Sequence, residues 1–404
     1  LMPRQKSQMN FVVEKAIMIA GRYGFQSMET PIFEFTEVFS RPLGESSDVV
    51  AKETYSFEDR GGTSLTLRPE GTASVMRALI SNGLTQTLPQ KFFYSGPMFR
   101  YERPQKGRMR QFHQIGCEFI GTFEPLADAE VISCAAHLLL ELGILDKCKL
   151  YLNSLGDAES RDKYRSVLIA YLKNYSAALS KDSQRRLALN PLRILDSKEI
   201  EDKEIIKNAP KLTEFLTVNS KEHFNRVTGA LEKSAINWQL DTNLVRGLDY
   251  YSHTAFEFVT DALGSQGTVI GGGRYDGLSS MLGGPNIGAV GFAAGVERLT
   301  FLIEKTEEFK YDVAVIIADD EASMDAFALA QKLRSVGLKV DIPFASQLGK
   351  KLKRANSLGC SLSLIIGKDE INTNTLQIKF MESGEQKKIA KSEAIAFVER
   401  LLKS

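Results

Sequence analysis

The stretch from Phe99 to Gln114 reads FRYERPQKGRMRQFHQ. The runs 91–100 and 110–119 on its two sides have the composition of strands, and the residues between them are polar and contain glycine and proline. This pattern predicts an antiparallel hairpin with a long loop. From Arg100 to Arg110 the sequence has five cationic side chains and one carboxylate. Because arginine forks suit phosphate oxygens, the hairpin is either a clamp for a polyanion or a solvated tip.

The second predicted strand carries an unusual face. Side chains alternate along a strand, so Phe112, Gln114, Gly116 and Glu118 lie on one side of the sheet. This side offers an aromatic plate, an amide, an empty position at the glycine and a carboxylate, which favours the floor of a small-molecule site over a core. His113 lies on the opposite side, where we expect a packed structural histidine.

Working outward, the sequence predicts three parts. Residues 1–156 and 235–309 form an α+β body with an antiparallel sheet, and residues 157–234 form a charged helical insertion. In residues 311–404 strands alternate with helices, which predicts a small α/β domain with a largely parallel core. No internal repeat is present.

Composition excludes several classes of protein. Hydrophobic residues make up 43% and charged residues 25% of the 404, which is ordinary for a globular protein. No uncharged apolar run approaches the roughly 18 residues of a membrane span, and residues 1–10 have no signal-peptide core. We therefore expect a cytoplasmic protein. The net charge of +1 excludes a chain-wide polycation but leaves room for a local basic groove.

The ends and the cysteines add two expectations. The chain starts with Leu1 instead of methionine, so some N-terminal sequence is expected to be missing. The four cysteines form no C-x-x-C pair, which favours reduced thiols over a disulfide framework. With only four histidines as well, we expect no structural zinc and no other bound metal site.

Three further segments each allow two interpretations. Glu70, at a predicted helix start, is either a cap that matches the helix dipole or a carboxylate that binds an ammonium group. Arg246, beside a glycine and before two tyrosines, forms either a surface ion pair or a second contact to the same anion as the hairpin. The run 271–277 is either a flexible turn or a place where backbone approaches a ligand. The phosphate-loop sequence G-x-x-x-x-G-K-[ST] is absent.

Taken together, these segments resemble the histidyl-tRNA synthetases, a family of class II aminoacyl-tRNA synthetases. Three class II signatures occur in the family's order: Gly24 to Pro31, the hairpin from Phe99, and Gly291 to Arg298. Three more match the histidine enzymes: 66–72, 244–251 and 272–278. The resemblance covers nearly the whole chain, except for a short leading segment before Leu1.

The resemblance implies a fold and a reaction. The fold is an antiparallel sheet of six or more strands flanked by helices, a helical insertion and a C-terminal α/β anticodon-binding domain. The family forms homodimers, with the segment around Pro31 at the interface. ATP, with Mg²⁺, activates histidine to histidyl-adenylate, and the histidine is then transferred to the 3′ end of histidine tRNA.

The resemblance also assigns roles to residues. Arg100 and Arg246 would act on the α-phosphate and the attacked carboxylate, Arg108 and Arg298 would hold the outer phosphates, and Phe112 would stack on adenine. The residues assigned to histidine are Glu70, Gly71, Thr72, Arg100, Gln114, Glu118, Arg246, Tyr250, Tyr251 and Tyr275. Those assigned to tRNA are Arg103, Gln105, Lys106, Lys350, Lys351, Lys353 and Arg354.

Two alternatives remain. The regulatory subunit of ATP phosphoribosyltransferase resembles the catalytic body but lacks the anticodon-binding domain, whereas residues from about 311 onward form a full domain here. A noncatalytic RNA-sensing module would lose the arginines of the phosphate clamp. All of them are present in this chain: Arg100, Arg108, Arg246 and Arg298.

Overall fold

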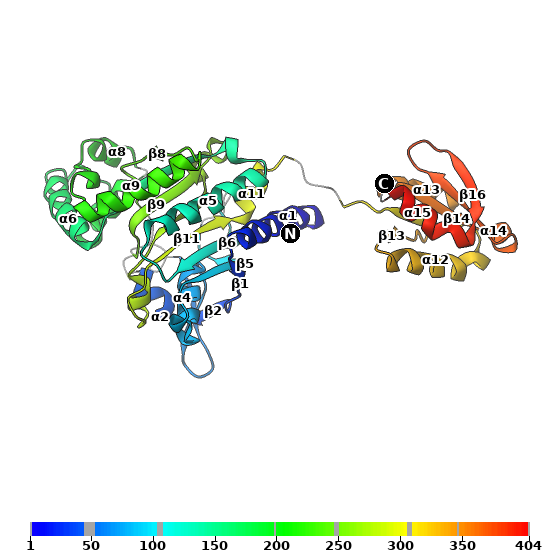
Figure 1. Ribbon diagram of the computed structural model, residues 1–404, viewed down its shortest axis with the longest axis horizontal. Helices are drawn as coiled ribbons and strands as arrows, with labels where there is room; N and C mark the ends of the chain where they lie inside the picture. Colours follow the sequence, from blue (N-terminus) through cyan, green and yellow to red (C-terminus); the bar gives the residue numbers. More distant parts are fainter. Residues whose placement is uncertain are drawn as a thin grey trace. The chain divides into compact units, whose positions relative to one another are not determined.

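The chain divides into two compact units, residues 1–306 and 307–404. The computed structural model, drawn in Figure 1, describes residues 2–43, 53–102, 108–197, 199–245, 250–304, 309–345 and 347–402. Within these residues, no helix combines the length and the apolar character needed to cross a membrane. The limits predicted from the sequence for three domains stay predictions.

The first unit is built on an eight-stranded sheet. Its strands, in order across the sheet, are β1 (Gln26–Ser27), β5 (Gln90–Phe99), β6 (Gln111–Ile120), β11 (Ala289–Gly295), β10 (Thr268–Arg274), β9 (Ser252–Val259), β7 (Lys149–Ser154) and β8 (Gln239–Leu240). All pairings from β5 to β7 are antiparallel, and only the outermost pairs, β1 with β5 and β7 with β8, are parallel. The predicted fold class is therefore confirmed, with parallel pairing added at the edges.

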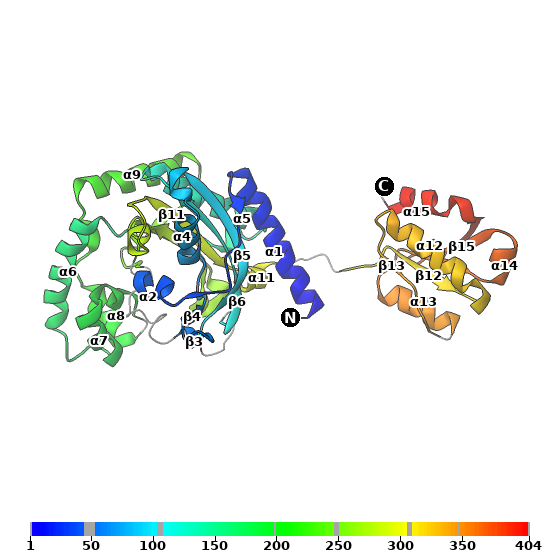
Figure 2. The same ribbon diagram turned by 90° about the horizontal axis from the view of Figure 1, so that it is seen from below.

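Long helices cover one face of this sheet (Figures 1 and 2). They are α1 (Pro3–Arg22), α5 (Pro125–Glu141), α9 (Val218–Lys233) and α11 (Val296–Leu302). In α1 the buried residues Met9, Val12, Ala16 and Ile19 recur at helical spacing, so one stripe of the helix faces the sheet. The four helices and the sheet share one apolar core.

The other face carries the residues that form the candidate site. Alternation along β5 places Phe93 in the core under the long helices and Phe92 and Tyr94 in a second apolar cluster. The helices α2 (Glu37–Leu43), α4 (Thr72–Ser81) and α10 (Leu278–Met281) contribute residues to this cluster. The strands β2 (Phe33–Phe35), β4 (Ser64–Leu67) and β3 (Tyr55–Glu58) form a separate antiparallel sheet in that order.

A group of shorter helices follows β7 and has its own core. They are α6 (Ala158–Lys173), α7 (Lys181–Leu189) and α8 (Ile200–Lys207). The buried Asp202 ties this group together, because its carboxylate accepts hydrogen bonds from Ser180, Ser183 and Ser197. Although α9 lies within the range predicted for the insertion, its buried residues join the core of the large sheet.

The second unit has a five-stranded sheet between two helical layers (Figure 2). Its order is β13 (Val340–Asp341), β12 (Val313–Ile317), β14 (Leu362–Ile366), β15 (Thr375–Phe380) and β16 (Gln386–Ala390). β12 pairs in parallel with both neighbours, whereas β15 and β16 extend the sheet as an antiparallel hairpin, so only half of the pairings are parallel. The helices are α12 (Ser323–Ser335), α13 (Leu348–Ser357), α14 (Lys368–Asn372) and α15 (Ala394–Leu402).

Candidate active site

Three arginines of the first unit lie near one another. Arg100 follows β5, and its Nε donates a hydrogen bond to the Pro69 carbonyl at 2.9 Å. Arg108 Nε lies 3.0 Å from a carboxylate oxygen of Glu102, and Arg298 Nη1 donates to a backbone carbonyl of β10 at 2.7 Å. Burial lowers the pKa of Arg298, and the charges of Arg108 and Arg100 lower it further. The three guanidinium groups therefore form one positive region that suits phosphate oxygens.

An aromatic ring adjoins this positive region. Phe112 is the second residue of β6, and its ring centroid lies 5.2 Å from the guanidinium carbon of Arg100. This cation–π contact fixes the ring beside the arginines. An aromatic face next to phosphate-binding groups matches the two halves of a nucleotide.

Glu118 is the centre of a neighbouring buried cluster of polar side chains, which we call the candidate pocket. Its side chain lies on β6 and is 1% exposed. Thr72 Oγ1 donates a hydrogen bond to one carboxylate oxygen at 2.7 Å, and the Tyr275 hydroxyl donates to the other. Burial raises the pKa of Glu118 to about 8, against the opposing effect of these two hydrogen bonds. A Cβ on Gly291 of β11 would overlap the carboxylate, so this position requires glycine.

Glu70 caps the helix that covers the pocket. Its carboxylate accepts the backbone N–H groups of Thr72 at 2.6 Å and of Ala73 at 2.9 Å, which are free donors in the first turn of α4. Burial raises the pKa of Glu70, while these hydrogen bonds and the charge of Arg100 lower it. In the structure, Glu70 therefore caps the N-terminus of α4, as the first of the two interpretations predicted. The influence of Arg100 also shows that the positive region adjoins the pocket.

Three tyrosines form the wall of the pocket. The ring centroids of Tyr250 lie 4.8 Å from Tyr251 and 5.7 Å from Tyr275, and the last two are 6.4 Å apart. Within the described residues, the buried Tyr250 hydroxyl and the Gln114 Oε1 atom have no hydrogen-bond partner. Because an unpaired buried polar atom costs free energy, such atoms around one pocket are typical of a ligand site.

The structure corrects one prediction about the floor of this pocket. Gly116 does not leave an empty position, because the ring of Tyr94 from β5 fills it. The two residues are direct partners across the β5–β6 ladder. The glycine is needed to admit an aromatic ring of the protein itself.

Comparison with known proteins identifies the family. The family model for histidyl-tRNA synthetase matches residues 1–299, and the model for an anticodon binding domain matches residues 312–401. The chain belongs to the histidyl-tRNA synthetase family. It is 52% identical to the histidine–tRNA ligase of Gluconacetobacter diazotrophicus over 94% of this chain and 91% of that protein. It is 50% identical to that of Rhodospirillum rubrum over 99% of this chain and 97% of that protein.

A solved structure of the same family has the same fold. The apo histidyl-tRNA synthetase of S. aureus aligns with a TM-score of 0.83 and 34% identity, over 98% of this chain and 97% of that one. The structure of the regulatory subunit/histidyl-tRNA synthetase from Bacillus halodurans aligns with a TM-score of 0.63 at 21% identity, which speaks to the fold alone. The class II synthetase fold predicted from the sequence is therefore confirmed.

Most residues that the resemblance assigns to histidine binding lie around Glu118 and Glu70 in the structure. They are Gly71, Thr72, Arg100, Tyr250, Tyr251 and Tyr275. Gln114 lies on the same face of β6, four residues before Glu118. Four other assigned residues lie outside the described residues: Arg103, Gln105, Lys106 and Arg246. His113 Nδ1 lies 2.8 Å from Glu297, on the face of β6 away from this pocket.

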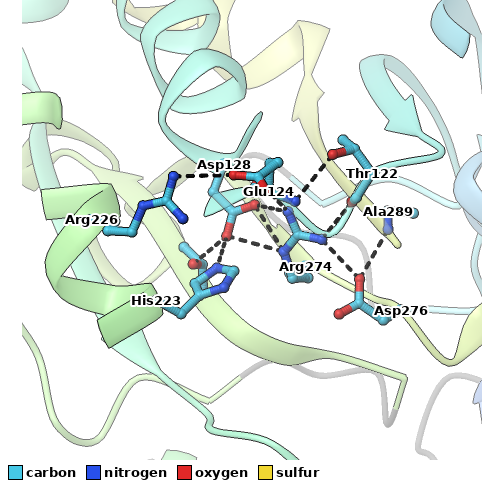
Figure 3. Close-up of polar contacts among 9 residues, drawn as sticks. Thr122, Glu124, Asp128, His223, Arg226, Arg274, Asp276 and Ala289 are labelled. Atoms are coloured by element: carbon cyan, nitrogen blue, oxygen red, sulfur yellow. Dashed lines mark hydrogen bonds and ion pairs between the residues drawn. The ribbon is translucent and has the colours of Figure 1, made fainter. Parts of the chain in front are cut away.

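Sequence reasoning missed a buried network in this synthetase fold, centred on Arg274 (Figure 3). Arg274, the last residue of β10, and Asp128 of α5 are both fully buried and form an ion pair through two guanidinium nitrogens. Arg274 Nη1 also donates to Asp276 at 3.0 Å, and Asp128 accepts from His223 Nε2 at 2.8 Å and from Thr254. The network joins β10, α5, α9 and β9, and it fixes the residue that precedes Tyr275.

The glycine run before Arg274 also serves packing within the protein. A Cβ on Gly272 would overlap the Phe256 ring and the Gly291 carbonyl, and a Cβ on Gly273 would overlap the Thr254 carbonyl. A Cβ on Gly273 would also lie 3.0 Å from the Tyr251 ring of the pocket wall. Gly272 and Gly273 therefore let groups of the protein itself pack closely at the centre of the sheet.

Proposed function

We propose that this chain is a histidine–tRNA ligase, which activates histidine with ATP and transfers it to the 3′ end of histidine tRNA. The observation that carries the proposal is the buried Glu118 carboxylate, which Thr72 and Tyr275 hold, together with the arginine cluster whose member Arg100 acts on nearby Glu70. The pocket offers a hydrogen-bonding carboxylate for imidazole, and the arginines offer charge for ATP. Membership of the family supports this pairing of sites.

The proposed first step is an in-line displacement. A carboxylate oxygen of histidine attacks the α-phosphorus of ATP, the bond to the β-phosphate breaks, and pyrophosphate leaves. Arg100 and Arg246 stabilise the charge at the α-phosphate, and Arg108 and Arg298 hold the outer phosphates with Phe112 stacked on adenine. Catalysis then consists of positioning and charge stabilisation, and no protein nucleophile is needed. ATP enters with Mg²⁺, as is general for synthetases of this class, and the reaction requires no zinc.

The proposed histidine site uses the groups around Glu118. Glu118 and Tyr251 contact the imidazole, and Tyr250 and Tyr275 line the pocket. The ammonium group lies near Glu70, Thr72 and Gln114, while Gly71 leaves space beside them. A site built from hydrogen-bonding groups rejects analogues that cannot pair with them.

The proposed function makes a direct prediction. The purified chain should exchange labelled pyrophosphate into ATP when histidine is present and should show only background exchange with the other amino acids. This assay needs no tRNA and therefore tests the activation step alone. Absence of histidine-dependent exchange in a folded preparation would contradict the proposed enzyme.

We further propose that tRNA contacts both units. In the first unit, the proposed contacts near the acceptor end are Arg103, Gln105 and Lys106. A cleft of about 300 Å³ beside the shorter helices offers RNA a further surface in this unit, because its lining includes Arg161, Arg165 and Tyr251. Arginines that lead to the histidine pocket suit an RNA backbone.

In the second unit, the proposed contacts lie on α13. Lys351 Nζ donates to a backbone carbonyl of β12 at 2.6 Å, and Arg354 binds the Asp341 carboxylate at 3.0 and 3.2 Å. Lys350 and Lys353 are exposed. We infer that the first pair orients the helix while the second pair contacts phosphates.

This division of labour can be tested with two double variants. Changing Lys350 and Lys353 to glutamine should weaken binding of every tRNA about equally, whatever its sequence. The number of counterions released on binding, read from the dependence of the binding constant on salt concentration, should fall by about two. Histidine-dependent pyrophosphate exchange should stay at the parent level. Changing Lys351 and Arg354 to glutamine is the matched control of equal charge, and it should mainly lower the unfolding temperature of the second unit. Equal salt slopes for both double variants would contradict the assignment.

We also propose a cytoplasmic homodimer. In the small sheet, cross-strand pairing aligns Phe33 with Leu67 and Tyr55, and Phe35 with Leu65 and Phe57, so one face is entirely apolar. The side chains of Phe33, Phe35 and Phe57 remain 50%, 55% and 45% exposed in the single chain. An apolar face of this kind marks a protein interface, and a second copy of the chain is the proposed partner.

The alternatives are not favoured. A regulatory subunit of ATP phosphoribosyltransferase would not need the anticodon binding domain that matches residues 312–401. A noncatalytic RNA-sensing module would not need the intact arginines Arg100, Arg108 and Arg298. The relatives at about 50% identity carry the name histidine–tRNA ligase.

A further inference from the structure

Tyr94 occupies a slot between two glycines at the centre of the candidate histidine pocket. Its side chain is 4% exposed, and it lies opposite Gly116 in the β5–β6 ladder. A Cβ on Gly116 or on Gly71 would overlap the phenol ring. Since glycines on two different elements make room for the same ring, its position is built into the pocket.

The hydroxyl group of Tyr94 lies among the charged groups of the pocket. Burial raises the pKa of Tyr94 well above its ordinary value, and the carboxylates of Glu118 and Glu70 raise it further, so the phenol stays protonated. A side-chain hydrogen bond with Thr72 opposes this rise in the pKa of Tyr94, but the Thr72 proton is donated to Glu118 at 2.7 Å, so Thr72 offers Tyr94 no donor. Within the described residues, no partner of the Tyr94 hydroxyl meets both the distance and the angle of a hydrogen bond.

An unpaired buried hydroxyl lowers the stability of the protein that contains it. Gln114 Oε1 and the Tyr250 hydroxyl, which are both assigned to histidine, are unpaired in the same way in the described part of the chain. Tyr94 shares this feature, and its partner across the ladder, Gly116, is two residues from Glu118 along β6. Buried polar atoms that the protein leaves unpaired are typical of a ligand site.

We propose that Tyr94 is a further specificity-determining residue, whose hydroxyl forms its hydrogen bond with the bound histidine between Glu70 and Glu118. This inference rests on the proposed function and adds a residue to its histidine site. It predicts that removing the Tyr94 hydroxyl weakens histidine binding but does not lower the stability of the protein without histidine. A residue that only supports the fold would change both in the same direction.

The test is Tyr94→Phe, which keeps the ring in its slot and removes only the hydroxyl. We expect KM for histidine in pyrophosphate exchange to rise about tenfold, the loss of one hydrogen bond in a buried site. KM for ATP should stay within about twofold of the parent value, because the arginines are untouched. The unfolding temperature without histidine should equal or exceed that of the parent, because an unpaired polar atom has been removed.

Tyr164→Phe is the matched control. Tyr164 is also buried, in the core of the shorter helices, but its hydroxyl donates to the Pro210 carbonyl at 2.9 Å and is therefore satisfied within the protein. Removing this satisfied hydrogen bond should lower the unfolding temperature and leave both KM values at the parent level. We therefore expect opposite results for the two variants: Tyr94→Phe changes KM for histidine without loss of stability, and Tyr164→Phe loses stability without a change in KM.

The outcomes separate the inference from the proposed function. A parent protein without histidine-dependent exchange overturns the proposed function, and this inference falls with it. An active parent whose Tyr94→Phe variant keeps the parent KM for histidine overturns the inference alone. The inference is also overturned if Tyr94→Phe lowers the unfolding temperature and raises KM for histidine and ATP equally, because that pattern indicates a structural role.

Discussion

Replacing Asp128 by asparagine is expected to lower the free energy of unfolding of the first unit by about 3–5 kcal/mol. The change leaves the fully buried Arg274 guanidinium without its main counter-charge. Burial alone would favour the neutral acid, but the Arg274 charge and the hydrogen bond from His223 hold the pKa of Asp128 below its ordinary value. The pair is therefore ionised at neutral pH, and its contribution is lost only as pH falls through the lowered pKa. Chemical denaturation at pH 7 measures the loss.

A second ion pair in the same view provides the control. Glu124 and Arg226 lie 3.1 Å apart on the surface, with side chains 68% and 46% exposed (Figure 3). Because exposed pairs contribute about 0–1 kcal/mol, Glu124→Gln should change stability little. If the Asp128 and Glu124 variants lose similar stability, the buried network does not stabilise the fold in the way proposed.

The network also bears on the active site. Arg274 immediately precedes Tyr275, whose hydroxyl donates to Glu118. Asp276, the residue after Tyr275, accepts from Arg274 and from the Ala289 N–H at 3.0 Å. Both neighbours of the tyrosine are therefore held, which limits how far its hydroxyl can move from the Glu118 carboxylate.

The sequence alone predicts the elements of this site that depend on local pattern. Alternation along 110–119 places Gln114 and Glu118 on one face, because strand period is a property of the backbone. The arginines of the hairpin are predictable as a cluster because they are close in sequence. Glu70 shows the limit of such reasoning, since a carboxylate two residues before a helix fits a cap and a ligand contact equally well.

Contacts between distant segments are not predictable in this way. Tyr94 fills the position opposite Gly116 only because of the exact pairing register of β5 and β6, which a single sequence does not specify. The partner of Arg274 lies 146 residues away in the chain. The glycines of 271–273 suggest close approach, but only the packed sheet reveals that the neighbours are Phe256 and backbone carbonyls.

Glu118→Gln is expected to raise KM for histidine about 10²-fold while KM for ATP changes by less than a few-fold. In the parent, Thr72 and Tyr275 both donate to the carboxylate. A glutamine would turn its N–H₂ group toward one of these hydroxyls, and the two donors would then face each other without an acceptor. The imidazole would meet an amide in place of a carboxyl group. Leaving such a buried group unpaired corresponds to roughly 2–3 kcal/mol. Equal changes in both KM values would indicate a structural role.

The same variant should also change how stability depends on pH. The folded pKa of Glu118 is raised from 4.5 to about 8, so its stabilising effect is complete below about pH 4.5 and is lost as pH rises through 8. Glutamine does not titrate, and the variant should therefore gain stability relative to the parent between pH 5 and 9, by up to roughly 5 kcal/mol. Glu141→Gln is a control of opposite sign, because its hydrogen bond from Lys15 lowers the pKa of Glu141, and this variant should lose relative stability as pH rises through the acid range. Denaturation curves at pH 3, 5, 7 and 9 compare the three proteins, and a constant difference between parent and Glu118→Gln from pH 5 to 9 would contradict the buried, proton-binding carboxyl group.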